Sequence, residues 1–324
     1  MPQLTFLEAI RQGIWEEMER DPSVFLLGED IGAFGGAFKV TAGMLDKFGE
    51  DRVIDTPISE SAIVGAAIGA ALMGMRPVAE MQFMDFISCG FDQIVNMAAK
   101  IHYRWGAPVP IVIRGPSGAG VHGGPFHSQS NEMWFAHVPG LKVVAPATVY
   151  DAKGLIKGSI RDNNPVIFYE HKYLYRRIKD DVPNDDYVVP LGKAAVRREG
   201  SDIAVITYGA MLWTALEAAD LLAQDGISLE IVDLRTLLPY DEQCVLSSVR
   251  KCGKVILLHE DTRIGGMAGE LAAAIAERAF DDLDGPIVRV TAPDTPVPFS
   301  PPLEEYFLPN VQKVIEAARQ LAAY

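Results

Sequence analysis

Cysteine is scarce in this sequence, and the positions of the few cysteines exclude the common metal and redox motifs. The 324 residues include three cysteines, Cys89, Cys244 and Cys252, and no CxxC pair. An odd number of widely spaced cysteines is typical of free thiols in a reducing compartment. No cluster of cysteine and histidine has the spacing of a zinc site.

Positive charge is also in short supply. The chain has 29 Lys and Arg residues against 43 Asp and Glu residues, for a formal net charge of −14. A nucleic-acid-binding protein normally carries a basic stripe. The short basic cluster at 176–179 is followed at once by Asp180 and Asp181, which indicates a solvated loop. We therefore expect no nucleic-acid partner.

No apolar run is long enough to cross a bilayer. The longest one, from Ser61 to Met75, spans 15 residues, whereas a membrane helix needs roughly 20. The first twenty residues mix acids and bases, unlike a signal peptide. We expect a cytoplasmic protein with no membrane contact.

Several standard catalytic motifs are missing as well. The sequence has no Walker loop, no GxSxG elbow, no HExxH and no GxGxxG after its first strand. The glycines of 32–36 lack the required spacing, so nicotinamide binding is not expected.

What the sequence does have is a regular alternation of helical and extended segments. Phe6, Ile10, Ile14 and Met18 recur every four residues and predict a helix over 5–20. Short apolar runs follow, among them 203–207 and 229–232, and alternate with further helical segments, the last of them at 311–322. This alternation predicts mostly parallel sheets covered by helices. The alternation breaks at the acidic, proline-punctuated segment 178–191, which we interpret as a linker. The prediction is an α/β protein with two domains, 1–185 and 186–324.

Glu60 is the first residue that could carry chemistry. It follows Ser59 between a strand and a helix, where the simpler interpretation is that Ser59 caps the helix and Glu60 complements its dipole. The helix that follows contains Gly65, Gly69 and Gly74, each of which lowers helix stability by about 1 kcal/mol relative to alanine. Such glycines are tolerated where another helix or a cofactor must approach the backbone closely.

A glycine-rich loop at 114–130 carries the second candidate, His127. Long glycine-rich loops inside compact domains are usually functional or disordered. His127 could act as a general acid or base because its ordinary pKa lies near neutrality. A role in hydrogen-bonding the loop to itself is equally compatible with the residues.

Taken together, nine segments resemble one family over essentially the whole chain, namely the β subunits of 2-oxo acid dehydrogenases (the pyruvate, branched-chain and acetoin types). No single segment would be specific, but all nine occur in the family's order. They are GEDIGAFGGAF (28–38), DRVIDTPISE (51–60), FDQIVNMAAK (91–100), FHSQS (126–130), PGLKVV (139–144), DAKGLI (151–156), IRDNNPVIF (160–168), VDLRTLLP (232–239) and DTPVPF (294–299).

The resemblance implies a thiamin-diphosphate pyrimidine-binding domain followed by a transketolase C-terminal-like domain. It implies that Glu60 contacts N1′ of the cofactor's aminopyrimidine, and that burial raises the pKa of this carboxylate. Ile58, Gln82 and Phe86 match positions that line the same pocket. His127 matches the histidine that positions the 2-oxo acid and handles protons.

The resemblance also implies a structural potassium ion at Ile111, Ser159, Asp162 and Asn164. The alternative for these residues is an Asp-Asn turn before a strand. The GDG motif that normally holds Mg²⁺ and the cofactor's diphosphate is missing. The family pattern therefore implies a separate α subunit that supplies the Mg²⁺ site and an α2β2 heterotetramer. From this we infer a subunit contact through the glycine-rich helix at 61–74.

Three functions remain open on the sequence. The first is oxidative decarboxylation of a 2-oxo acid with reductive acylation of the lipoyl groups of an acyltransferase core. For this function we rank pyruvate before branched-chain 2-oxo acids and acetoin. The second is an assembly subunit that tethers the α subunit to that core, for which the acidic charge is suitable. The third is a fragment of a transketolase or deoxyxylulose-phosphate synthase, which the missing diphosphate motif disfavours.

Overall fold

The structure, a computed structural model, describes residues 3–324 and divides into two compact units. The first unit comprises residues 1–117 and 134–191, and the second comprises 118–133 and 192–324. The chain thus leaves the first unit at 118, returns at 134 and leaves it again at 192. The sequence analysis did not anticipate the excursion at 118–133, which contains His127.

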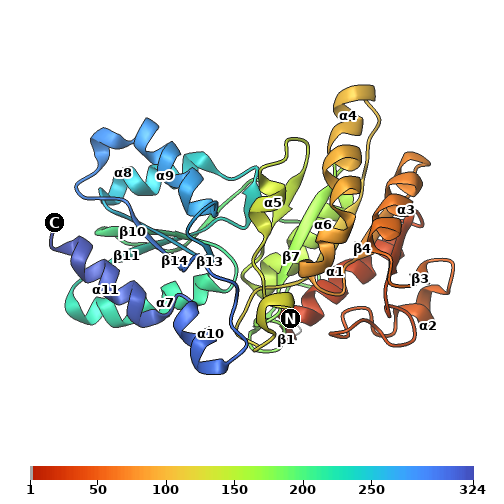
Figure 1. Ribbon diagram of the computed structural model, residues 1–324, viewed down its shortest axis with the longest axis horizontal. Helices are drawn as coiled ribbons and strands as arrows, with labels where there is room; N and C mark the ends of the chain where they lie inside the picture. Colours follow the sequence, from red (N-terminus) through yellow and green to blue (C-terminus); the bar gives the residue numbers. More distant parts are fainter. Residues whose placement is uncertain (1–2) are drawn as a thin grey trace. The chain divides into compact units, whose positions relative to one another are not determined.

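The first unit is a six-stranded parallel sheet with helices against it (Figure 1). Its strands run in the order β6-β7-β5-β4-β2-β3, and β1 and β8 form a separate antiparallel pair. The strands are β1 (Gln3–Thr5), β2 (Val24–Gly28), β3 (Val53–Asp55), β4 (Arg76–Glu80), β5 (Val112–Ser117), β6 (Lys142–Val144), β7 (Val166–His171) and β8 (Lys179–Asp181). The helical segments are α1 (Phe6–Arg20), α2 (Met44–Phe48), α3 (Glu60–Leu72), η1 (Met84–Gly90), η2 (Gln93–Ala98), α4 (Ala99–Trp105), α5 (Glu132–Ala136) and α6 (Val149–Arg161).

Local sequence explains how α1 begins and where it packs. The Thr5 side chain accepts the Glu8 N–H and the Glu8 carboxylate accepts the Thr5 N–H, which is a capping box. Further along, Gly13 faces α6, where a Cβ would lie 2.5 Å from Cγ2 of Ile156. A residue without a side chain is therefore required at this helix crossing.

The second unit is a five-stranded sheet in the order β14-β13-β10-β11-β9. All neighbours are parallel except β9, which pairs antiparallel with β11 and was not predicted. The strands of this sheet are β9 (Ala195–Arg198), β10 (Ile203–Thr207), β11 (Leu229–Asp233), β13 (Val255–Thr262) and β14 (Val288–Ala292), and the short strand β12 (Thr236–Leu238) is not part of it. The helical segments are η3 (Gly124–Phe126), α7 (Met211–Leu222), η4 (Ala223–Asp225), α8 (Glu242–Cys252), α9 (Met267–Arg278), η5 (Phe280–Asp282), α10 (Pro301–Phe307) and α11 (Val311–Ala322). Two α/β units with mostly parallel sheets confirm the predicted fold class.

The acidic segment 178–191 is not the free linker that its composition suggested. Lys179–Asp181 forms β8, and further on the Asp186 carboxylate pairs with Lys157 and Arg161, two of the three cations of α6. Tyr187 stacks on Tyr150 with ring centroids 4.4 Å apart. The aperiodic pattern arises because this segment packs on one helix through isolated side chains rather than through a repeating face.

Candidate active site

The candidate site in the first unit lies at the carboxyl edge of the parallel sheet. Strands β3, β2 and β4 are neighbours, and the residues that follow them include Glu60, Glu29 and Gln82 respectively. Ligands of open parallel sheets bind outside the carboxyl ends of the strands. The sheet topology therefore brings together residues that are up to 53 positions apart in the sequence, from Glu29 to Gln82.

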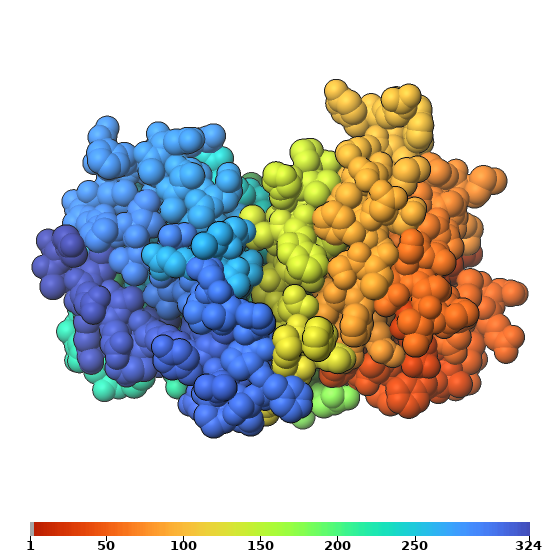
Figure 2. Space-filling view, viewed as in Figure 1, coloured from red at the N-terminus to blue at the C-terminus, as the bar shows by residue number. Residues whose placement is uncertain are grey.

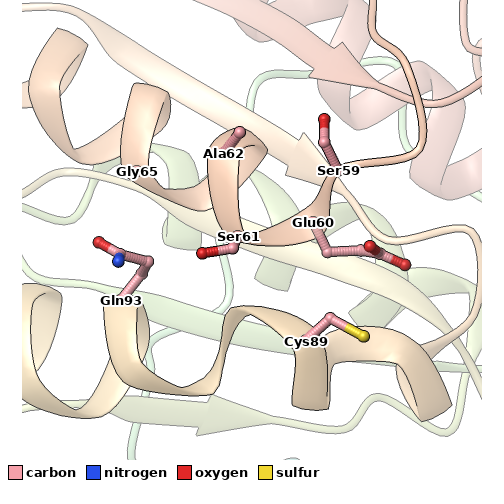
Figure 3. Close-up of a pocket in the computed structure, with 7 residues that line it drawn as sticks. All are labelled: Ser59, Glu60, Ser61, Ala62, Gly65, Cys89 and Gln93. Atoms are coloured by element: carbon pink, nitrogen blue, oxygen red, sulfur yellow. The ribbon is translucent and has the colours of Figure 1, made fainter.

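Glu60 opens α3 and faces a hollow of about 510 Å³. Figure 3 shows its side chain extending from the first turn of α3 on the side where Cys89 lies. The residues that line this hollow are Ser59, Glu60, Ser61, Ala62, Gly65, Cys89 and Gln93. Sequence reasoning missed Cys89 and Gln93, because they come from η1 and η2 and no motif links them to Glu60.

The predicted capping role of Ser59 is wrong. Its side chain makes no cap hydrogen bond and instead donates to the Pro57 carbonyl at 3.0 Å. Although Ser59 occupies the N-cap position, its side chain therefore accepts no hydrogen bond from the first N–H groups of α3. Glu60 lies in this first turn. An anion is favoured at such a helix end.

Glu29 is a second carboxylate at this edge, and it was not predicted as a site residue from the sequence. It is 6% exposed, and Oε1 is buried with no hydrogen-bond partner among the described residues. Burial raises the pKa of Glu29, and the negative charge of Glu60 raises it further. Glu60 itself is only half-buried. The family resemblance implied that burial raises the pKa of Glu60. In this chain the carboxylate that is buried, and whose pKa is raised, is Glu29.

The three other residues predicted to line the pyrimidine pocket are not among those that line the hollow. Ile58 is 84% exposed. The Gln82 amide donates to Oδ2 of Asp30 at 3.2 Å, next to Glu29 in the sequence. Phe86 packs edge-on against Phe83 with centroids 6.2 Å apart. Through Asp30, Gln82 is therefore hydrogen-bonded to the segment that follows β2, where Glu29 also lies. No residue in the described part of this chain covers the side chain of Ile58.

A buried ion network lies at the same edge, under the carboxyl ends of β4, β5 and β7. The Arg114 guanidinium donates to the carboxylates of Glu80 and Glu170, and the Tyr175 hydroxyl donates to Glu170 at 2.6 Å. Burial raises the pKa of Glu80, while the charge of Arg114 opposes this shift. The network fixes three neighbouring strand ends together.

His127 belongs to the second unit, whereas Glu60 belongs to the first. It is half-buried and follows η3, and its N–H donates to the Gly124 carbonyl at 3.3 Å. The neck of the loop is closed where the Gly118 N–H donates to the Gln129 carbonyl at 3.2 Å. Both interpretations of His127 remain compatible with this geometry.

Carboxylates of β13 lie beside the same loop. Glu260 accepts the Ala119 N–H, and the Ser130 hydroxyl lies 3.5 Å from the same oxygen. Burial raises the pKa of Glu132 well above its ordinary value, and the charges of Asp261 and Glu260 raise it further. Burial likewise raises the pKa of Asp261 to about 6. Within residues 3–324, however, no group of three or more His, Cys, Asp or Glu side chains is arranged to hold a metal ion.

Two of the four residues predicted to bind potassium, Asp162 and Asn164, form a turn. The Asn164 N–H donates to Oδ1 of Asp162 at 2.8 Å. The carbonyls of Ile111 and Ser159 accept the N–H groups of Val166 and Asp162, at 2.9 and 3.2 Å. The Arg76 guanidinium donates to the Asp162 carbonyl at 3.0 Å. The Asp-Asn turn is therefore present, and a cationic side chain already lies against one of the four residues.

Two families of domains match the chain. Residues 2–177 match the transketolase pyrimidine-binding domain, and residues 192–314 match the transketolase C-terminal domain. A solved structure described as a split-gene transketolase, inactive β4 tetramer, is similar with a TM-score of 0.82. It covers 99% of this chain and 98% of its own, at 23% identity, and so supports the fold alone.

Curated proteins are similar over the full length. The 2-oxoisovalerate dehydrogenase subunit beta of Bacillus subtilis is 54% identical over 100% of both chains. The pyruvate dehydrogenase E1 component subunit beta of the same organism is 46% identical, also over 100% of both. The beta subunit of the acetoin:2,6-dichlorophenolindophenol oxidoreductase of Cupriavidus necator is 48% identical, over 98% of this chain and 97% of that one.

Proposed function

Because this chain belongs to the β subunits of the 2-oxo acid dehydrogenases, we propose that it forms one part of a thiamin-diphosphate-dependent site that decarboxylates a 2-oxo acid. The family confirms the resemblance found in the sequence, including the two transketolase-type domains and the enzymatic role. The observation that carries the proposal is the pair of carboxylates, Glu29 and Glu60, at the carboxyl edge of the pyrimidine-binding sheet.

The residues at this edge are suitable for an aminopyrimidine. Among the described residues the buried Oε1 atom of Glu29 has no hydrogen-bond partner, and Glu60, whose charge raises the pKa of Glu29, faces the hollow. A carboxyl group whose pKa is raised, as that of Glu29 is, beside a second carboxylate is typical of proton-transfer sites. Bound thiamin diphosphate would supply the nucleophilic carbon and the electron sink for decarboxylation. Glu60 would then hold a proton at the pyrimidine ring, while Ile58, Gln82 and Phe86 would line the ring's surroundings.

His127 is proposed to orient the 2-oxo acid and to move a proton during decarboxylation and acyl transfer. An imidazole can do both because its ordinary pKa lies near neutrality. Reductive acylation of the lipoyl groups of an acyltransferase core would complete the reaction. We also propose that residues 1–185 form the pyrimidine-binding domain and residues 186–324 the transketolase C-terminal-like domain.

The β-subunit relatives imply an α partner, and we propose that the α subunit holds Mg²⁺ and the diphosphate in an α2β2 heterotetramer. The surface of the first unit supports a subunit contact. A Cβ at Gly69 of α3 would meet nothing within 4 Å, so packing inside this chain does not explain that glycine. Ile58 and Met73, at the two ends of α3, are 84% and 85% exposed. The end of α4 projects from its surroundings in Figure 2, and Tyr103 there is 96% exposed.

For the substrate, the relative named for 2-oxoisovalerate is more similar than those named for pyruvate and acetoin, at 54% against 46% and 48% identity. We therefore place a branched-chain 2-oxo acid ahead of pyruvate, which the sequence analysis had ranked first. Discrimination by one methylene is worth about 1–3 kcal/mol. A few pocket residues could therefore move the preference.

Two further predictions stay open. Potassium at Ile111, Ser159, Asp162 and Asn164 rests on the family resemblance. The cytoplasmic location rests on the free thiols of Cys89, Cys244 and Cys252. None of the helices of residues 3–324 combines the length and the hydropathy needed to span a membrane.

The test is reduction of an artificial electron acceptor by the chain co-purified with its α partner. Thiamin diphosphate and Mg²⁺ are supplied with 3-methyl-2-oxobutanoate, pyruvate or acetoin in turn. Glu60→Gln and His127→Ala should lower turnover by about 100-fold or more without preventing co-purification. The exposed Glu50 and His137 serve as matched controls and should tolerate the same changes. Undiminished turnover in both site variants would instead favour the assembly role.

A further inference from the structure

The loop that carries His127 is held along its first limb by carboxylates of its own unit. Both oxygens of Glu304, on α10, are used for this contact. Oε1 accepts the Gly120 N–H at 3.0 Å and Oε2 accepts the His122 N–H at 3.1 Å. The Nδ1 atom of His122 also lies 2.6 Å from Oε2. Next to these contacts, Glu260 accepts the Ala119 N–H.

The carboxylate of Glu304 is buried and therefore needs these hydrogen bonds. The residue is 1% exposed, and a buried carboxylate is unfavourable unless it accepts hydrogen bonds. The loop in turn needs the carboxylate, because His122 has a φ of +59°, a left-handed conformation that is unfavourable for a residue with a Cβ. Each side of the contact thus offsets an unfavourable feature of the other.

The held limb packs directly against His127. A Cβ at Gly123 would lie 3.0 Å from Cβ of His127, so the two residues are in close backbone contact. A Cβ at Gly124 would lie 2.6 Å from Cδ2 of Phe299, so the loop is also enclosed on that side. Because Gly123 directly follows the held residues 120–122, a shift of their backbone is expected to reach His127 through Gly123.

We propose that Glu304 is a positioning residue for His127: its carboxylate fixes the backbone of 120–122, and this backbone sets the place of the imidazole. The inference rests on the proposed function, in which His127 acts on the 2-oxo acid. Glu304 does not itself meet the substrate in this role. The loop cannot hold itself in this way, because the N–H groups of Gly120 and His122 point to an acceptor from α10.

The experiment uses the complex assembled with the α subunit and loaded with thiamin diphosphate and Mg²⁺. The variants are Glu304→Ala and Glu304→Gln, with Glu305→Ala as the control, since Glu305 is the exposed neighbour on the same helix. Amide hydrogen exchange at Gly120 and His122 reports the contact directly. Turnover of 3-methyl-2-oxobutanoate and pyruvate, measured in parallel, reports its effect on the reaction.

We expect Glu304→Ala to speed exchange at both amides by about 10-fold or more. Its kcat should fall by about 10- to 100-fold, as for a misplaced catalytic group, with KM changed less than about 2-fold. Glu304→Gln retains one acceptor oxygen and so should expose only one of the two amides. In a His127→Ala background, Glu304→Ala should change kcat by less than about 2-fold, because a residue that acts through His127 has nothing left to position.

Wild-type exchange at both amides in Glu304→Gln, with wild-type kcat, would overturn the proposal even if Glu304→Ala does not fold. Equal losses from Glu304→Ala with and without His127 would overturn it too, because the effect would then bypass the imidazole. A failure of the proposed function looks different. In that case His127→Ala keeps full turnover, while the exchange at Gly120 and His122 still reports whether Glu304 holds the loop.

Discussion

Replacing Arg114 by methionine would test how strongly the buried ion network stabilises the first sheet. Arg114 is 1% exposed, and its partners Glu80 and Glu170 are 6% and 0% exposed. Methionine fills much of the same volume but leaves two carboxylates without a cation in the protein interior. Breaking a buried pair by removing one partner costs about 3–5 kcal/mol, a large share of the roughly 5–15 kcal/mol that stabilises a domain.

The loss should depend on pH in a defined direction. Burial already raises the pKa of Glu80, and removal of the Arg114 charge should raise it further. A carboxyl whose pKa is higher in the folded than in the unfolded state binds its proton more tightly when folded. Stability is therefore lost as the pH rises above the unfolded pKa of about 4.3 towards the folded value. The variant should lie closer to the wild type at pH 5 than at pH 8.

The assay is urea unfolding of the full chain, followed by circular dichroism at pH 5 and pH 8. Arg104, an exposed arginine on α4, provides the control, and Arg104→Met should stay within about 0.5 kcal/mol of the wild type. Adding Glu80→Gln and Glu170→Gln to Arg114→Met should recover part of the loss. A loss below about 1 kcal/mol at pH 8, or the same loss at both pH values, would refute the reasoning.

Four further substitutions, one of them a control, test individual contacts. Hydrogen bonds from Lys157 and Arg161 lower the pKa of Asp186 to about 2. The contribution of Asp186 to folding stability is therefore fully present above its unfolded pKa and is lost as the pH falls through about 2. Asp186→Asn, on this exposed group, should cost less than about 1 kcal/mol at pH 7 and only a small part of that at pH 2, as measured by thermal unfolding. Gly124→Ala should lower the melting temperature, because φ is +68° and the new Cβ would meet Phe299. The control Gly269→Ala has open space at its Cβ. It should therefore stabilise the protein by about 0.5–1 kcal/mol and raise the melting temperature. Gly13→Ala should destabilise the α1–α6 crossing by about 1–3 kcal/mol, and an unchanged urea midpoint would contradict the close approach.

The sequence by itself determined the fold class and most of the elements. Helix α11 was predicted with its observed limits, 311–322, and α1 to within one residue, because each has an apolar stripe of helical period. The strands β10 and β11 were predicted because a buried parallel strand is a short, continuous apolar run. The nine motif segments led to the family, because their order along the chain is fixed independently of the coordinates.

The tertiary structure alone decided which distant residues meet. The segment around Glu29 does not by itself predict a contact with Glu60; the proximity of the two carboxylates follows from the adjacency of β2 and β3. The loop at 118–133 reads as part of the first domain, yet it packs in the second unit because the buried carboxylates of Glu260 and Glu304 accept its backbone N–H groups. Such contacts join single side chains to backbone atoms of any residue type. They therefore leave no periodic trace in the sequence, and only the folded chain reveals them.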